Sequence, residues 1–201
     1  MIDHLPKNAV QELKHSLSEK RFNHSLNVMQ TALNLADAWE NEYPIDRCLL
    51  AWAALFHDCA KELGHQEERH LLENHEIQYG LELMQTPSLV HAPLGAMLLE
   101  VKWDVHDPDV LTAVAYHPTG HPELSPIGWA VYLADYLEPG RTYFFEREEM
   151  YQAALKDPLD GLRRVTTLRI NTVKQLKKPI NPAVCYFKEY LDSIRTLEVV
   201  R

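Results

Sequence analysis

The sequence predicts an all-α fold, a bundle of helices around a single core. Only seven of its 201 residues are glycine, and 46% are apolar. Apolar residues recur at helical spacing over long stretches, and no convincing hairpin signal interrupts them. A chain of this length can bury one sizeable core. We therefore expect a helical core domain over residues 1–142 and a helical extension over residues 143–201 that packs on it.

Two long helices open the predicted bundle. Residues Phe22 to Trp39 carry a broad apolar stripe, which is typical of a helix with one wide buried face. After a turn, a second helix is expected to begin behind Asp46 as its N-cap and to stop at Gly64. Because this second segment is almost entirely apolar, we expect it at the centre of the bundle.

Shorter helices complete the prediction. They cover the ranges 66–74, 79–85, 91–102, 108–117, 126–137 and 158–176. No helix is assigned to the aromatic and acidic stretch 142–152. Asn181 and Pro182 fit the N-cap and the first position of a last helix.

Composition and charge argue against several kinds of partner. The formal net charge of -9 argues against sequence-independent binding to nucleic acid, which depends on clustered Lys and Arg. No apolar stretch is long enough for a membrane span, and the first residues do not have the order of a secretory signal. Three cysteines without a CxxC pair fit a reducing compartment. We therefore expect a cytoplasmic protein without a membrane or nucleic-acid partner, and the sequence is compatible with a homodimer.

The dipeptide His57-Asp58 is the first candidate for chemistry. With eleven His in the chain, about 0.6 His-Asp pairs are expected by chance, so the pair alone is weak evidence. A second pair, His106-Asp107, lies in a polar turn, where Asp107 is better explained as a helix cap. His57-Asp58 instead ends an apolar helix, and buried polar groups need partners. A metal ion satisfies both an imidazole and a carboxylate.

Further metal-ligand candidates lie on separate predicted helices. They are His24, His91, His117 and Asp135. Helical bundles build metal sites in this way, from inward side chains on facing helices. For any one of these histidines alone, a surface position or a hydrogen-bonded core position is the simpler explanation. Taken together, in this order and at helix ends, they favour a metal site.

Five motifs resemble a known family. RFNH, LFHDCAK, HAPLGA, YHPTG and YLADYLEPGR are similar to segments of the YqeK-type HD-domain proteins of bacteria, which are symmetrical diadenosine tetraphosphatases. The resemblance covers roughly residues 18–142. It implies hydrolysis of diadenosine tetraphosphate to two ADP by metal-activated water. It also implies two transition-metal ions, iron first, with manganese, cobalt or zinc as alternatives.

The resemblance also implies roles for individual residues. One ion is expected among His24, His57, Asp58 and Asp135, with Asp58 bridging to a second ion held by His91 and His117. Apart from the resemblance, three cations lie near these ligands in the sequence: Arg21 one turn before His24, Lys61 three residues after Asp58, and Arg141 six residues after Asp135. We therefore expect Arg21, Lys61, Thr119 and Arg141 to bind the substrate, and Asp58 and Lys61 to be catalytic.

Alternatives remain open at this stage. Lys61 and Arg21 also fit ordinary helix-end positions, and Glu138 is a candidate for orienting a ligand histidine or Arg141. The cluster 143–145 fits either a cover for a nucleobase or the core. Other HD phosphohydrolases, acting on a nucleoside monophosphate or a guanosine alarmone, need the same metals. A non-catalytic nucleotide-sensing module is the alternative outside the enzymes.

Overall fold

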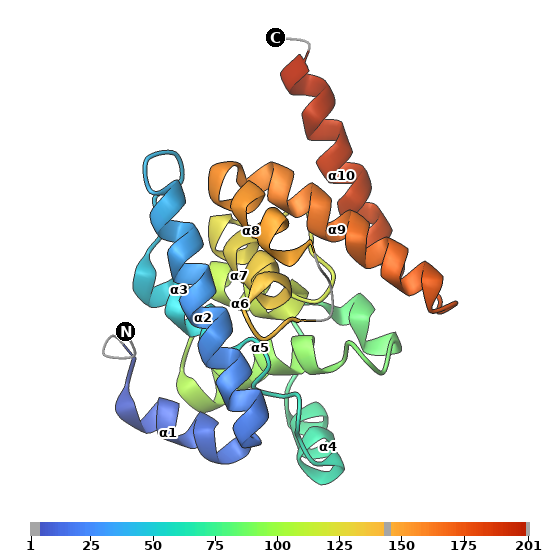
Figure 1. Ribbon diagram of the computed structural model, residues 1–201. Helices are drawn as coiled ribbons and strands as arrows, with labels where there is room; N and C mark the ends of the chain where they lie inside the picture. The colour runs from blue at the N-terminus through green and yellow to red at the C-terminus, as the bar shows by residue number, and fades with distance from the viewer. Residues whose placement is uncertain (1–4, 143–145, 200–201) are drawn as a thin grey trace.

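The computed structural model describes residues 5–142 and 146–199, and every regular element in these two ranges is a helix. The predicted all-α class is therefore confirmed (Figure 1). The elements in chain order are α1 Lys7–Ser16, α2 Glu19–Trp39, α3 Arg47–Phe56, α4 His65–Asn74, η2 Leu81–Gln85, α5 His91–Trp103, α6 Pro108–Tyr116, α7 Pro126–Leu137, α8 Arg147–Lys156, α9 Pro158–Gln175 and α10 Pro182–Val199.

Helices α2, α3, α5, α6 and α7 form the centre of the bundle. α2 packs on α3 and α7, and α6 packs on α3, α5 and α7 (Figure 1). The side chains of Phe56 on α3 and Tyr132 on α7 have no exposed surface. Apolar residues on all sides of α3 and α7 explain why both lie inside, because a helix without a polar face gains most from full burial.

Several helix starts follow from single side chains. The carboxylate of Asp46 accepts hydrogen bonds from the backbone N–H groups of Cys48 and Leu49, at 2.8 and 3.0 Å. Asn181 Oδ1 accepts a bond from the N–H of Ala183 at 2.9 Å. Both residues are the predicted N-caps, and each satisfies N–H groups that have no partner within the helix.

Two expectations about helices were wrong, and two helices were missed. The helix after Asp46 does not reach Gly64, because it ends at Phe56 and turns follow. Residues 81–85 form a 3-10 helix rather than an α-helix. The pattern also did not predict α1 and α8, although α1 buries Ala9 and Leu13, one helical turn apart.

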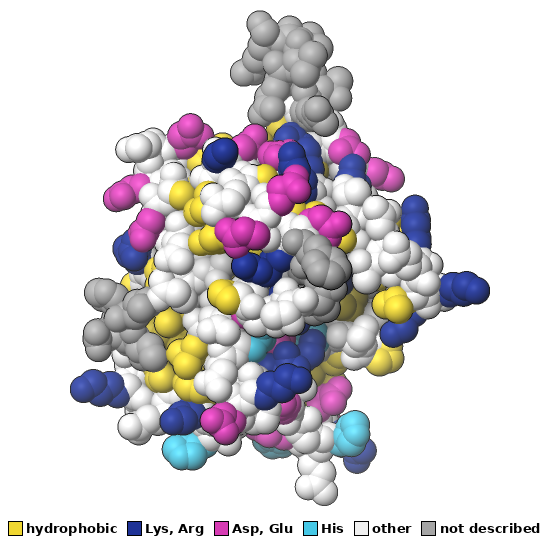
Figure 2. All heavy atoms as spheres, in the orientation of Figure 1, with side chains coloured by type: hydrophobic (Ala, Val, Ile, Leu, Met, Phe, Trp, Pro, Cys, Tyr) yellow, Lys and Arg dark blue, Asp and Glu magenta, His cyan; other side chains and the backbone are white. Residues whose placement is uncertain are grey.

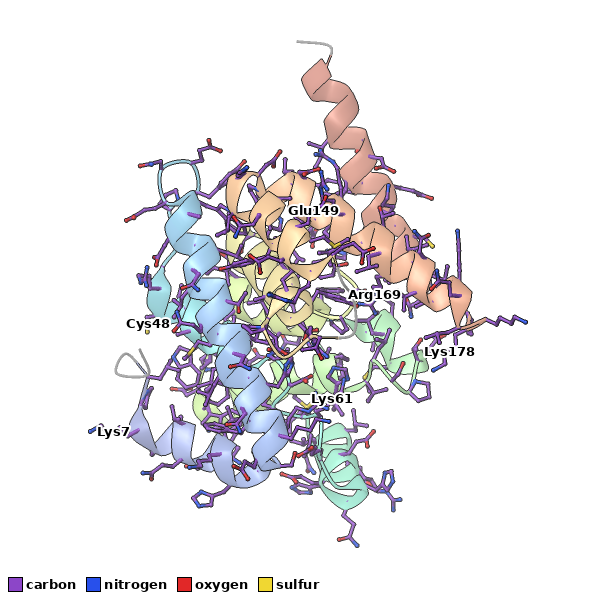
Figure 3. All side chains as sticks on the ribbon, viewed as in Figure 1. Lys7, Cys48, Lys61, Glu149, Arg169 and Lys178 are labelled. Atoms are coloured by element: carbon purple, nitrogen blue, oxygen red, sulfur yellow. The ribbon has the colours of Figure 1, made fainter. Side chains whose placement is uncertain are left out.

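The C-terminal helices α8 and α9 pack on α2 and α7 of the bundle. α9 contacts α7 (Figure 1). The guanidinium of Arg169, which is labelled in Figure 3, lies 5.6 Å from the centre of the Tyr136 ring. α10 lies along α9 and inserts Phe187, whose ring centre is 5.6 Å from that of Tyr132. A domain boundary at residue 142 remains a prediction.

Phe187 also closes the turn after α6. Gly120 has a φ of +71°, a conformation that side chains rarely adopt. A Cβ atom at this position would come within 2.0 Å of the Phe187 ring. Only glycine therefore fits here.

Candidate metal centre

His57 and Asp58 enter the core because α3 ends just before them. The N–H of Cys59 bonds to the carbonyl of Phe56 at 3.0 Å, and the N–H of Lys61 bonds to the carbonyl of Asp58 at 3.0 Å. These tight turns replace the α-helical pattern and direct both polar side chains inward. His57 is 0% exposed and Asp58 is 3% exposed. Burial of two such groups requires partners for both.

One group of potential ligands combines α2 with this turn and α7. His24, His57 and Asp58 each offer an atom within 4.8 Å of the others. Asp135 Oδ1 lies 3.1 Å from His24 Nε2 and 3.9 Å from His57 Nε2. The structure thus brings together the four residues predicted for the first ion.

A second group lies on the other oxygen of Asp58. Asp58 Oδ1 is 3.3 Å from His91 Nε2 and 3.6 Å from His117 Nε2, and these two nitrogens are 3.4 Å apart. Asp58 Oδ2 faces the first group, at 3.6 Å from His57 Nε2 and 4.0 Å from His24 Nε2. A carboxylate in this position can bridge two ions through its two oxygens.

Two buried polar atoms of the cluster lack a hydrogen-bond partner among the described residues. His57 Nε2 and Asp58 Oδ1 are shielded from solvent, and neither makes a hydrogen bond with the residues that the structure describes. Such orphaned polar atoms cost about 1–3 kcal/mol each. Both atoms belong to ligand types that bind transition metals. The donor set therefore fits a pair of metal ions.

Hydrogen bonds behind the rings set their orientation. The Nδ1–H of His57 donates to the Ala54 carbonyl, and that of His117 donates to the Val114 carbonyl, both at 2.8 Å. Each histidine stands at the C-terminal end of its helix and bonds to the residue three positions earlier. With Nδ1 carrying the proton, Nε2 presents its lone pair to the cluster, as metal ligation requires.

Glu138 holds the third ring in the same way. Its Oε1 accepts the Nδ1–H of His24 at 3.2 Å. Its Oε2 accepts bonds from Asn27 Nδ2 at 3.1 Å and from the N–H of Gly140 at 2.5 Å. Asn27 was missed by the sequence analysis. Its only signal there is its position, a polar side chain one turn after His24.

Protonation states also suit metal binding. Burial lowers the pKa of His57 to about 4 and that of His91 to about 2, so both rings are neutral at pH 7. Burial alone would raise the pKa of Asp58, but the neighbouring His57 and His117 hold it well below its usual range. The same balance, with His24 and Arg141 as the opposing neighbours, keeps Asp135 ionised. Neutral imidazoles and charged carboxylates are the forms that bind metal ions.

The three predicted cations all contact the cluster. Arg21 Nη1 donates to Asp58 Oδ2 at 2.7 Å, and Lys61 Nζ lies 2.8 Å from His91 Nε2. Arg141 pairs with the Asp135 carboxylate and donates from Nε to the Asp135 carbonyl at 2.7 Å. Burial lowers the pKa of Lys61. The positions agree with contacts to phosphate, and the roles assigned to these residues remain predictions.

Other candidates lie apart from the cluster or are hidden. Thr119 is fully buried, so its contact with substrate stays a prediction. The second His-Asp pair is outside the cluster: His106 is 62% exposed and pairs with Asp104, and Asp107 caps α6 through the N–H groups of Asp109 and Val110. The cluster 143–145 lies outside the described residues.

Comparisons with known proteins agree with this geometry. The family model of the HD domain matches residues 21–140, a range that contains every ligand candidate. A crystal structure from Clostridium acetobutylicum, titled a predicted HD superfamily hydrolase involved in NAD metabolism, superposes with a TM-score of 0.81. It is 32% identical, and the match covers 94% of this chain and 97% of that one.

Curated relatives narrow the family further. The symmetrical bis(5'-nucleosyl)-tetraphosphatase of Halalkalibacterium halodurans is 34% identical over 174 residues, 87% of this chain and 88% of the relative. The enzyme of the same name from Bacillus subtilis is 35% identical over 131 residues, 65% of this chain and 68% of its own. The chain therefore belongs to the HD-domain family and, within it, to the symmetrical bis(5'-nucleosyl)-tetraphosphatases.

Proposed function

We propose that this protein hydrolyses diadenosine tetraphosphate at its centre, with water as the nucleophile, and releases two ADP. The observation that carries the proposal is the position of Asp58, whose two oxygens face two separate groups of ligand-type side chains. The curated relatives that cover most of the chain carry the name of this activity. An intact ligand set argues against a module that only senses nucleotides.

We propose two metal ions, one among His24, His57, Asp58 and Asp135 and one among Asp58, His91 and His117. Four imidazoles and two carboxylates without a thiolate suit iron, and they also accept manganese, cobalt or zinc. Metal ions bound here would supply a hydroxide near neutral pH, because they lower the pKa of water from 15.7 to about 7.

The protein's own side chains bind and orient the phosphates. Arg21 and Arg141 contact the carboxylates of the first group, and Lys61 contacts His91 of the second. A polyphosphate that lies across the cluster would meet a cation on each flank of the attacked phosphorus. These cations stabilise the negative charge that develops on the phosphoryl oxygens. In the view of Figure 2, histidine side chains are visible near the middle of the molecule, beside Lys and Arg side chains.

Location and assembly are part of the proposal. No helix in the described part of the chain is long and apolar enough to cross a membrane. We expect the protein to act in the cytoplasm, where nucleotide substrates are available and thiols such as the buried Cys59 stay reduced. A homodimer remains a prediction, which sedimentation of the purified protein would test.

Hydrolysis in isotopically labelled water tests the proposal. Metal-loaded protein is incubated with diadenosine tetraphosphate, and the products are separated and weighed by mass spectrometry. Central attack gives only ADP, with the label on one of the two products of each event. Appearance of AMP and ATP would mean attack at an outer phosphorus. Consumption of a guanosine alarmone or a nucleoside monophosphate, without consumption of diadenosine tetraphosphate, would support the other HD phosphohydrolases.

A further inference from the structure

Two separate hollows adjoin the metal centre. Hollow A has a volume of about 520 Å³, and its walls include His24, Arg21 and Arg141. Hollow B has a volume of about 400 Å³, and its walls include His91 and Lys61. Hollow A therefore adjoins the first group of ligands, and hollow B adjoins the second. Because Asp58 joins the two groups, a substrate with two arms can place one arm toward each hollow.

The two hollows differ in chemistry. Hollow A is lined largely by polar side chains, among them Asn23, Asn27 and Glu62. Hollow B has an apolar wall of Leu63, Met84, Pro87, Val90 and Leu94. Ligand pockets usually combine such a wall with a few polar groups that fix orientation. Only hollow B of the two has this combination.

Polar groups stand at defined places around hollow B. Lys61 Nζ lies 2.8 Å from His91 Nε2 and 3.8 Å from Asp58 Oδ1, so the ammonium stands between the hollow and the cluster. Glu68, one-third exposed, lies with His65 among the remaining lining residues. A phosphate chain that leaves the cluster past Lys61 would thus carry its terminal nucleoside to an apolar wall.

We propose that hollow B binds the nucleoside of one ADP half of the substrate, with the apolar wall against the base and Lys61 on the adjoining phosphates. The inference rests on the proposed function. The flat faces of a purine are weakly hydrated and gain by contact with apolar side chains.

A further hollow of about 290 Å³, which Lys178 lines, shares no residue with the cluster. Figure 3 shows Lys178 and Lys61 on different parts of the molecule.

Met84 allows a direct test. It is partly buried on η2, lines hollow B and is not among the ligand candidates. Calorimetry on metal-loaded protein measures binding of ADP and of inorganic tripolyphosphate, which has phosphates but no nucleoside. Met84→Ala should weaken ADP about tenfold, because apolar contacts to the ligand are lost, and should leave tripolyphosphate unchanged. Met84→Leu, which restores most of the wall, should bind ADP nearly as well as the wild type.

Leu81→Ala is the matched control. Leu81 lies on the same short helix, is 64% exposed and does not line the hollow, so both ligands should bind as in the wild type. Unchanged ADP binding in Met84→Ala would overturn the inference. An equal loss for ADP and tripolyphosphate would overturn it as well, because the wall would then support the phosphate site rather than the base.

The outcome is separable from that of the proposed function. If the wild type does not cleave diadenosine tetraphosphate, the proposed function fails. Selective loss of ADP in Met84→Ala would still establish hollow B as a nucleoside site. If the wild type cleaves diadenosine tetraphosphate but Met84→Ala binds ADP as tightly as the wild type does, the proposed function stands and the nucleoside binds elsewhere.

Discussion

Glu138 Oε1 accepts the Nδ1–H of His24 at 3.2 Å, and this bond turns the Nε2 of His24 toward Asp135 and Asp58. Glu138 is 3% exposed, and its other oxygen is held by Asn27 and Gly140. The carboxylate thus acts on the metal centre through His24 without belonging to the ligand groups. Such outer partners of ligand histidines fix the tautomer and the angle of the ring.

Glu138→Gln should weaken metal binding at the His24 group. The new amide must present an N–H₂ group either to His24 or to the N–H donors of Asn27 and Gly140, so at least one hydrogen bond is lost. We expect the affinity for one of two ions to fall roughly tenfold to a hundredfold, while the other ion stays bound. Titration of metal-free protein with a metal chelator as competitor measures this. Glu67→Gln, on the exposed surface of α4, is the control, and equal affinities in the two variants would refute the role of Glu138.

The two His-Asp pairs should respond in opposite ways to substitution. Asp58→Ala removes the carboxylate that faces both ligand groups, so turnover should be abolished and both ions should bind less tightly. Asp107→Ala removes only an N-cap of α6, which should cost about 0.5–2 kcal/mol of stability. Its activity should stay within about threefold of the wild type, because Asp107 is remote from the reaction.

Kinetics and thermal melts of both variants check this pair of predictions. His106→Ala serves as a further control, since His106 is largely exposed. Comparable loss of activity from the two pairs would show that the active site is not at Asp58.

Metal analysis should find about two ions per chain, with iron able to support activity. Protein is made in iron-supplemented cells, purified without oxygen and analysed by elemental spectroscopy. Chelation should remove activity, and it should lower the melting temperature because ions that bind only the folded state stabilise it. Less than about half an ion per chain, with no gain from added iron, manganese or cobalt, would refute the metal centre.

The metal-free protein should lose stability on mild acidification. In the folded state the pKa of His57 is lowered from 6.5 to about 4, and that of His91 from 6.5 to about 2. Between pH 6.5 and about 4 the unfolded chain therefore binds more protons than the folded chain, and the free energy of unfolding falls as the pH falls. Above pH 6.5 the contribution is complete. The depressed pKa values of Asp58 and Asp135 act in the same direction below pH 3.8.

Denaturant titrations of metal-free protein between about pH 7.5 and about pH 5 measure this effect. Stability that stays level across the range would show that the two buried rings gain protons in the folded state as they do in the unfolded chain.

The sequence predicted most of the bundle and all the residues that meet in the two ligand groups. It succeeded with Asp46 and Asn181 because capping depends on neighbours in the chain. It failed at the end of α3, since nothing local in the segment from Phe56 to Gly64 marks a stop. The helix ends there because the turns at His57 and Asp58 bring polar side chains to partners on α2, α5, α6 and α7.

The residues that hold the ligand His24 in place were harder to predict from the sequence than the ligands themselves. Glu138 was only a weak candidate, and Asn27 was missed, because the bond between them joins residues far apart in the chain. Spacing within one helix cannot reveal such a pair. The two hollows could not be predicted from the sequence either. Their walls combine segments whose proximity depends on the packing of the whole bundle.

The contact between the ring of Phe187 and Gly120 can form only late in synthesis of the chain. Every ligand candidate, from His24 to Asp135, is translated before Phe187. The turn that follows His117 is therefore made before the side chain that later fills the space beside it. A nascent chain holds a complete set of ligand residues while the aromatic ring behind this turn is still to be made.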